Sequence, residues 1–180
     1  VPSLHELPTK VGAENTVLYL SKLKGKRVGI VSNQTSMING VHLVDTLISL
    51  GVDLTVVFSP EHGFRGDYDA GAQIKHGVDA KTGLPIFSLH GKTKKPSASI
   101  MDSVDIIVFD IQDVGVRFYT YISTLHYVME SVAENNKEII ILDRPNPNAN
   151  YIDGPVLQPK YKSFIEMHPV PIVYGMTIGE

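Results

Sequence analysis

The residues best suited to chemistry form a short polar cluster that directly follows an apolar, β-branched run. Glu61, His62 and Arg65 come soon after the run at positions 54–58. Glutamate is a poor turn residue, so its place after Pro60 indicates a functional role rather than a backbone one. A partly buried carboxyl group has a raised pKa, because burial disfavours its charged form, and this suits a general acid. We therefore predict that Glu61 donates a proton, while His62 fits a substrate contact and an ordinary loop histidine equally well.

A second polar cluster follows the apolar run at positions 104–109. Its members combine acids, an amide, an arginine and tyrosines, and they are Asp110, Gln112, Asp113, Arg117, Tyr119 and Tyr121. The arginine is suited to binding a substrate carboxylate through two parallel hydrogen bonds, or to holding one of the acids ionised. In extended backbone the two tyrosines face the same way, where they could stack on a sugar ring or pack in the core with bonded hydroxyls. Both alternatives stay open.

Two further apolar runs also end in polar residues, which are Asn33, Gln34, Asp143 and Arg144. Asparagine or aspartate after a strand often makes only a turn or a helix cap, so Asn33 and Asp143 fit a structural and a functional role equally well. Arg144, like Arg65, could bind an anion or form a surface ion pair. Because the carboxyl ends of parallel strands lie along one edge of a sheet, we expect all these residues to share one site.

The elements that must position these residues alternate between strand-length apolar runs and helical patterns. The predicted strands span residues 27–32, 54–58, 85–89, 104–109 and 138–142. The predicted helices span residues 15–25, 41–51 and 121–135. This alternation indicates βαβ units, so we predict an α/β fold, a Rossmann-like three-layer sandwich with a mainly parallel sheet. The first strand is not followed by a dinucleotide-binding GxGxxG pattern, and no cofactor is expected.

The first two predicted helices should each bury one apolar face, because residues three and four positions apart share a side of a helix. The expected buried residues of the first helix are Val17, Leu18, Leu20 and Leu23. Those of the second helix are Val41, Leu43, Val44, Leu47, Ile48 and Leu50.

The last part of the chain differs in texture from the rest. Residues 1–150 form the predicted Rossmann-like catalytic domain, whereas residues 151–180 are proline-rich and irregular, with one short strand expected at 171–174. Thr177 and Glu180 have the spacing of a capping box at the start of a helix. We therefore expect residues 151–180 to lead to a second domain that is absent from this chain, and the chain alone to be inactive.

Composition narrows the function classes. The chain has 180 residues, of which 43% are hydrophobic, enough for one substantial core. A net charge of -3 gives no general attraction to nucleic acid or anionic membranes, and the lysines within positions 92–95 are expected to form a solvated loop. The absence of cysteine excludes thiolate catalysis, and no apolar run reaches the length of a membrane span. The histidines lack metal-binding spacing, so no metal site is expected.

Four blocks of sequence together resemble a known family. They are residues 59–66, 109–121, 142–147 and 174–180. In order and in length they are similar to the signature blocks of the NamZ-like exo-β-N-acetylmuramidases, long catalogued as a domain of unknown function. The similarity runs from about Lys26 to the last residue.

The resemblance implies a bacterial glycosidase of peptidoglycan recycling that releases N-acetylmuramic acid from the non-reducing end of cell-wall fragments. It implies a Rossmann-like N-terminal domain, a smaller C-terminal domain and an active-site pocket between them, in an extracytoplasmic protein that is periplasmic or secreted. The glutamate of the family's first block is its proposed catalytic acid, and that position is Glu61 here.

The resemblance also suggests roles for the other charged residues. In a 2-acetamido sugar the substrate's own carbonyl can act as the nucleophile, and Asp110 or Asp113 could orient that amide, unless the absent domain does so. The lactyl carboxylate of the sugar calls for an arginine, and the candidates in order are Arg117, Arg144 and Arg65. Two alternatives remain, namely a non-catalytic peptidoglycan- or sugar-binding module and a metal-dependent hydrolase that uses His62 with the two acids.

Overall fold

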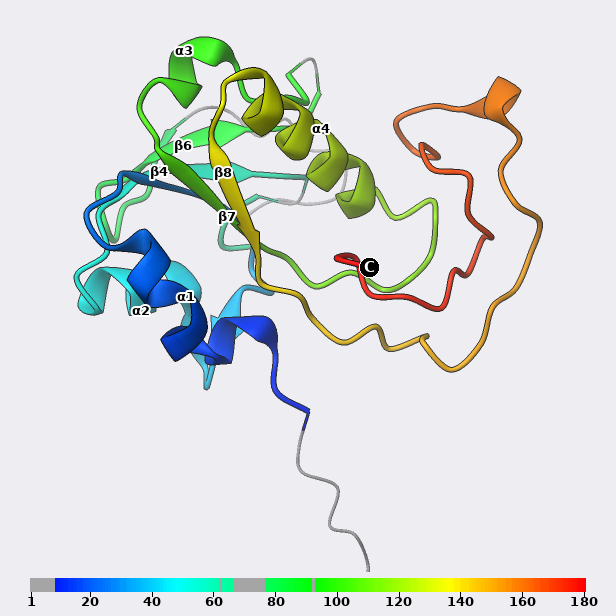
Figure 1. Cartoon of the computed structure of the whole chain (residues 1–180), viewed down its shortest axis with the longest axis horizontal. Helices are drawn as coiled ribbons and strands as arrows, with labels where there is room; N and C mark the ends of the chain where they lie inside the picture. Colours follow the sequence, from blue (N-terminus) through cyan, green and yellow to red (C-terminus); the bar gives the residue numbers. More distant parts are fainter. Residues whose placement is uncertain (1–8, 62, 67–76, 92) are drawn as a thin grey trace, which may run out of the picture.

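The computed structural model of the protein describes residues 9–61, 63–66, 77–91 and 93–180 (Figure 1), so His62 lies outside the described residues. Its central sheet contains β1 (Val28–Ser32), β4 (Leu54–Ser59), β5 (Gly77–Val78), β6 (Pro85–Ser88), β7 (Ile106–Asp110) and β8 (Glu138–Ile141). The strand order is β5-β6-β4-β1-β7-β8. Only the short β5 pairs antiparallel with its neighbour, and the other pairs are parallel.

Helices cover both faces of this sheet. Figure 1 shows α1 (Thr16–Leu23) and α2 (Leu43–Ser49) on one side, and α3 (Ala98–Met101) and α4 (Tyr121–Glu134) on the other. The parallel strands, numbered along the chain, lie in the order 3-2-1-4-5 that is typical of Rossmann-like sheets. The α/β prediction with a mainly parallel sheet is therefore confirmed. Within the described ranges, no helix is long and apolar enough to cross a bilayer.

The strands supply a hydrophobic core on each side of the sheet because successive side chains point to opposite faces. In β7, Ile106 and Val108 pack in the cluster beneath α1 and α2. Ile107 and Phe109 pack in the cluster beneath α4. All four are at most 1% exposed, so the sheet is buried on both faces, as parallel sheets usually are.

The predicted buried face of α1 is partly wrong. Val17 and Leu18 are 85% and 69% exposed, whereas Tyr19 and Leu23 are buried. These two lie four residues apart, so a two-turn helix can bury both on one side. The Tyr19 hydroxyl also donates to the carbonyl of Ala13 at 2.7 Å, which satisfies its polar end inside the core.

The predicted second helix starts too early. Val41 belongs to β3 (Val41–His42), which pairs antiparallel with β2 (Met37–Ile38) in a small hairpin. Asn39 and Gly40 form its turn with φ of 48° and 80°, the left-handed values that a tight hairpin turn requires. The helix α2 then buries only Leu43, Val44 and Leu47, while Val41, Ile48 and Leu50 are exposed.

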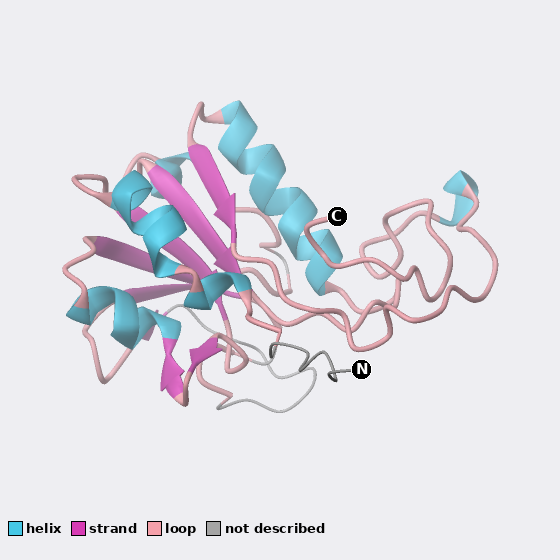
Figure 2. Ribbon diagram, turned by 60° about the horizontal axis from the view of Figure 1, so that its bottom comes forward, coloured by secondary structure: helices cyan, strands magenta, loops and turns pink. Residues whose placement is uncertain are grey.

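The last residues form a long excursion away from the sheet, and the C-terminus returns to lie beside α4 (Figure 2). The backbones of Asp153 and Val173 exchange two hydrogen bonds, of 3.1 and 2.9 Å, and close residues 154–172 into a loop, here called the C-terminal loop. It holds one short 3-10 helix, η2 (Pro159–Tyr161). The strand predicted at 171–174 is reduced to bridges from Val173 to Val116 and Asp153.

The predicted capping-box contact between Thr177 and Glu180 is present. The Thr177 N–H donates to the Glu180 carboxylate at 2.8 Å, and the Glu180 N–H donates to the Thr177 hydroxyl at 3.3 Å. These are the reciprocal bonds that satisfy backbone donors where a helix starts.

Candidate functional site

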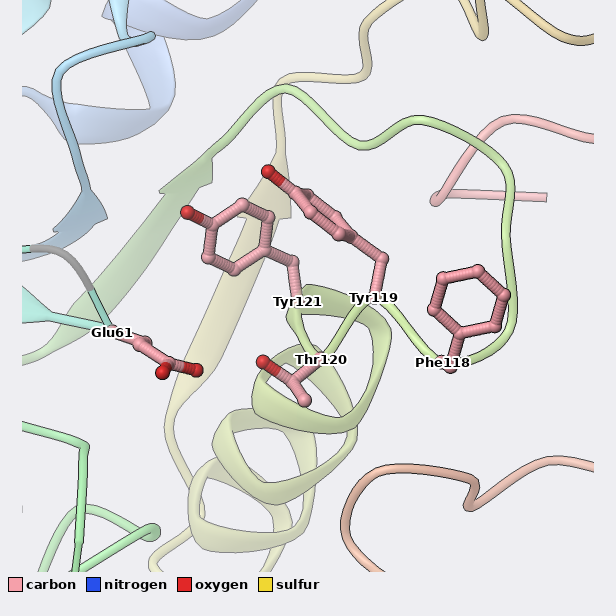
Figure 3. A pocket seen from close by; sticks show the side chains of 5 residues that line it. All are labelled: Glu61, Phe118, Tyr119, Thr120 and Tyr121. Carbon is pink, nitrogen blue, oxygen red and sulfur yellow. The ribbon is translucent and has the colours of Figure 1, made fainter. Parts of the chain in front are cut away.

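Glu61 follows the carboxyl end of β4 and points into a hollow beside the start of α4. Figure 3 shows its carboxylate directed towards Thr120 and Tyr121. This hollow, here called the tyrosine pocket, has a volume of about 200 Å³. The described residues of its wall are Glu61, Phe118, Tyr119, Thr120 and Tyr121. The glutamate singled out in the sequence therefore faces a cavity together with both tyrosines of the second cluster.

Glu61 also lines a second and larger hollow of about 490 Å³, here called the loop pocket. Its described wall consists of Glu61, His90, Gly91, Lys94, Thr120, Ser163, Phe164 and Ile165. Glu61 and Thr120 are thus shared by the two pockets. Such a group can contact a bound molecule that extends from one hollow into the other.

The strand register explains why these side chains meet. Ser32 of β1 pairs with Asp110 of β7, and Ser59 of β4 pairs with Ser88 of β6, so the apolar strands end at matching levels. In open α/β sheets, ligands bind in the crevice outside the carboxyl ends of the strands. Glu61 leaves β4 there, and the segment after β7 returns as the first turn of α4.

Asn33, at the end of β1, holds Tyr121 in place. It is fully buried, its side-chain amide donates to the Tyr121 hydroxyl at 2.9 Å, and its side-chain oxygen accepts from the Thr35 N–H at 2.9 Å. Asn33 thus both stabilises the turn after β1 and supports Tyr121 in the pocket wall. Burial raises the pKa of Tyr121, and the nearby Tyr119 and the charge of Glu61 raise it further, so Tyr121 keeps its proton at neutral pH.

The rings of Tyr119 and Tyr121 meet edge to face, with centroids 5.0 Å apart and planes at 85°. Tyr121 is buried, whereas Tyr119 is 37% exposed. This arrangement leaves Tyr119 accessible from the pocket while Tyr121 forms part of its rigid wall.

Asp110 lies beneath the site and does not line either Glu61 pocket. Both of its carboxylate oxygens accept from Arg144, at 2.6 Å from Nε and 2.9 Å from Nη2. Burial raises the pKa of Asp110, and the Arg144 guanidinium opposes that rise. The pair is almost completely buried, so we assign Asp110 and Arg144 to the support of the strand ends rather than to substrate contact.

The carboxylate of Asp113 is likewise engaged in internal hydrogen bonds. One of its oxygens accepts from the Gly115 N–H at 2.9 Å and from the Tyr174 hydroxyl. Burial raises its pKa, which these two donors partly offset. Asp113 therefore ties the segment after β7 to the residues near position 174 and does not line either pocket.

The sequence interpretation of Arg117 needs correction, since it contacts neither Asp110 nor Asp113. It is 5% exposed, and its Nη1 donates to the carbonyls of Pro155 at 2.8 Å and Val170 at 2.6 Å. Its Nε and Nη2 donate to Glu166 at 3.3 and 3.1 Å. Arg117 thus fastens both ends of the C-terminal loop.

Arg65 is also committed to internal partners. It donates to Asp79 at 2.8 and 2.9 Å and to Asp45 at 3.1 and 3.3 Å. Hydrogen bonding from Arg65 lowers the pKa of Asp79 to about 2, with burial opposing. These contacts anchor the segment that carries Glu61 to α2 and to the turn before β6.

The remaining predicted residues lie outside the two pockets. Gln34 is exposed, and the Gln112 amide donates to the carbonyls of Asp113 and Pro145 at 2.7 and 2.8 Å. Asp143 accepts from the Thr177 hydroxyl and from the Gly179 N–H at 3.2 Å, so it joins the end of β8 to the last residues. His62 cannot be placed because it is outside the described residues.

Several pocket residues were missed in the sequence. His90 and Gly91 follow β6, so the strand-end rule that found Glu61 also applies to them. Lys94 was interpreted as part of a solvated loop, and Phe164 lies in an irregular segment that carries no local signal. Sequence distance hides this last contact, because Phe164 reaches the pocket only through the folding of the C-terminal loop.

Comparison with known proteins identifies the family of this chain. Residues 28–180 match the family described as Exo-beta-N-acetylmuramidase NamZ, N-terminal. The chain is 48% identical over 167 residues to Peptidoglycan beta-N-acetylmuramidase NamZ of Bacillus subtilis (strain 168), covering 90% of this chain and 40% of that protein. It therefore spans about two fifths of the length of this relative.

Two crystal structures of DUF1343 family proteins from Bacteroides fragilis NCTC 9343 share the fold. One is 48% identical with a TM-score of 0.83, and the other is 43% identical with a TM-score of 0.86. Each match covers 94% of this chain and 44% of the solved chain. The resemblance noted in the sequence is confirmed, and this chain belongs to the NamZ family of exo-β-N-acetylmuramidases, of which it represents the N-terminal part.

Proposed function

We propose that the full-length protein is a glycoside hydrolase that releases N-acetylmuramic acid from the non-reducing end of peptidoglycan fragments, with Glu61 as general acid. The observation that carries this proposal is the position of Glu61 between two adjoining pockets, one lined by tyrosines and one lined partly by the C-terminal loop. The general acid of a glycosidase must reach the glycosidic oxygen, which joins the terminal sugar to the leaving group. Family membership supports the same class of reaction.

In the proposed reaction Glu61 gives its proton to the glycosidic oxygen as the bond from that oxygen to the anomeric carbon breaks. The acetamido carbonyl oxygen of the sugar attacks the anomeric carbon and forms a cyclic intermediate. Water then adds to the same carbon and returns a proton to Glu61. Asp110 and Asp113 are held in structural contacts, so the group that orients the acetamido nitrogen is proposed to come from a second domain outside this chain.

The alternative of a metal-dependent hydrolase requires Asp110 and Asp113 as metal ligands, but both are engaged in other contacts. Asp110 is paired with Arg144, and Asp113 with Tyr174 and Gly115. Among the described residues, no group of three or more potential ligands is placed to hold a metal ion. A non-catalytic sugar-binding module would use the same pockets, and it differs by the absence of turnover in the full-length protein.

The test is Glu61→Gln in the full-length protein, with N-acetylmuramic acid linked either to a sugar or to nitrophenol. We expect turnover of the sugar-linked substrate to fall by about 100- to 10,000-fold, with product binding nearly intact. The loss should be smaller for nitrophenol, which leaves readily without a proton. Glu138→Gln, at an exposed ion pair with Lys26, is the matched control. Near-wild-type turnover of both substrates by Glu61→Gln would refute the acid role.

We further propose that residues 151–180 lead to the second domain and that the protein is extracytoplasmic. The length of the relative supports the second domain, because that protein is more than twice as long as the matched part. The location is proposed from the peptidoglycan substrate proposed above. Turnover by the isolated chain would contradict the need for a second domain. Recovery of the protein only from the cytoplasm of fractionated source cells would contradict the location.

A further inference from the structure

The three arginines expected to bind the lactyl carboxylate of N-acetylmuramic acid are all engaged elsewhere. Arg117 fastens the C-terminal loop, Arg144 pairs with Asp110, and Arg65 pairs with two aspartates. Displacing any of them would leave a buried or half-buried carboxylate or carbonyl without its donor, which is costly. A different cation must therefore meet the substrate if the sugar is recognised through its acid group.

Lys94 lies in the wall of the loop pocket, the larger of the two hollows that contain Glu61. No carboxylate among the described residues pairs with it. Its neighbour Lys95 differs, because it lies 3.2 Å from Glu130 and 2.6 Å from Glu134 on the outer side of α4. Of these two adjacent lysines, Lys95 forms structural ion pairs, whereas Lys94 places an unpaired positive charge in the pocket wall.

The Lys94 ammonium is held over the ring of Phe164, with Nζ 4.1 Å from the ring centroid. Phe164 in turn stacks on Tyr127 of α4, with centroids 6.0 Å apart and planes 16° from parallel. A cation–π contact fixes the place of an ammonium and leaves hydrogen-bond donors available. The aromatic ring also offers an apolar surface against which a sugar or a lactyl methyl group can pack.

We propose that Lys94 is a specificity-determining residue that binds the lactyl carboxylate of the substrate in the loop pocket. This inference rests on the proposed function and deepens it. With a carboxylate at Lys94, the sugar that bears it lies in the same hollow as Glu61. Phe164 keeps the ammonium in place, so recognition depends on the C-terminal loop as well as on the sheet edge.

The experiment uses the full-length protein with two matched substrates, a glycoside of N-acetylmuramic acid and the same glycoside with its lactyl group methyl-esterified. For the wild type we expect KM to be about 10-fold or more lower for the free acid, the value of one charge-assisted hydrogen bond. Lys94→Gln should abolish this preference by raising KM for the free acid to about the value for the ester. Lys94→Arg should restore much of the preference for the free acid, and Lys95→Gln should retain the full preference.

An acid-over-ester preference in Lys94→Gln equal to that of the wild type would overturn the proposal. Binding separates this failure from failure of the proposed function. If the wild type hydrolyses neither glycoside, calorimetry with free N-acetylmuramic acid and N-acetylglucosamine still applies. Preferential binding of the acid that disappears in Lys94→Gln supports the assignment, and equal binding of both sugars by the wild type contradicts it.

Discussion

Gly115 packs against Asn146 so closely that no side chain fits between them. Its φ is +71°, and an ideal Cβ on Gly115 would overlap the side-chain amide of Asn146. That amide is fixed, because it donates to the Met176 carbonyl at 2.9 Å and accepts from the Asn148 N–H at 2.8 Å. We expect Gly115→Ala to lower the free energy of unfolding by about 3 kcal/mol, from left-handed strain and overpacking together. The midpoint of urea denaturation measures this.

Gly25→Ala is the matched control for this substitution. Gly25 has nearly the same φ, +72°, but a Cβ there would have no neighbour within 4 Å. Gly25→Ala should lower the free energy of unfolding by about 1–2 kcal/mol, from backbone strain alone. Equal losses at the two positions would show that the close approach to Asn146 contributes nothing.

Single residues also mark how far the sequence could predict the site. Glu61 was identifiable because a glutamate in a turn after a strand has no backbone role, and Tyr119 and Tyr121 followed from the same strand-end argument. The arginines were not assignable, because an arginine suited to binding a substrate carboxylate is equally suited to pairing with Asp110, Asp79 or Glu166. Which partner it takes depends on contacts between distant segments that no local pattern reveals.

The C-terminal loop depends on Arg117, which is the only residue in the described part of the chain shown to donate to both Pro155 and Val170. Arg117→Met should release both carbonyls and Glu166 while retaining an apolar stem. We expect amide hydrogen exchange within residues 154–172 to rise about 10-fold or more, and exchange in β1 and β7 to stay unchanged. Mass spectrometry of the exchanged peptides measures both.

Lys26→Met provides the comparison, because it breaks an exposed ion pair with Glu138 that should be worth little. It should leave exchange in the C-terminal loop at the wild-type rate. If Arg117→Met also leaves exchange in the C-terminal loop at the wild-type rate, other contacts hold the loop and the role given to Arg117 is wrong.

Elements differed in how well they could be predicted. The five parallel strands and α4 were found because their apolar runs are long and their spacing is regular, whereas the two-residue β5 was not predicted. The β2–β3 hairpin was missed although Asn39-Gly40 is a strong hairpin signal, since the apolar residues around it also fit a helix. The C-terminal loop gave no signal, because its shape comes from Arg117 and from backbone pairing across distant segments.

The whole molecule should lose stability in acid through its depressed carboxyl groups. The folded pKa of Asp79 is about 2, below its ordinary value of 3.8, because Arg65 favours the charged form. A depressed pKa stabilises the fold above the unfolded value, and this contribution is lost as pH falls from about 4 towards 2. We expect about 1–2 kcal/mol from Asp79 in the free energy of unfolding.

Asp79→Asn should lower stability at pH 7 and flatten its decline between pH 4 and pH 2. Urea denaturation at both ends of that range measures the difference. Burial raises the pKa of Asp110 and Asp113, so their contribution has the opposite sign and cannot mimic the result. A decline in Asp79→Asn as steep as in the wild type would remove Asp79 as its cause.

At this scale the sequence predicted the architecture well, because alternating apolar runs and helices admit few arrangements other than a parallel sheet. It also predicted the edge of the sheet at which Glu61 faces the two pockets. It could not predict that the end of β8 turns away from the pockets, since Asp143 and Arg144 find partners near positions 177 and 110 only in the folded chain.

Apart from Glu61, the loop pocket is lined by residues such as His90, Lys94, Thr120 and Phe164, and these four all belong to connecting segments rather than to strands of the sheet. Exchanging such residues alters what the hollow accepts without repacking the sheet. Natural variation, or a laboratory library confined to those few codons, can thus change the lining of the hollow while the framework beneath stays intact.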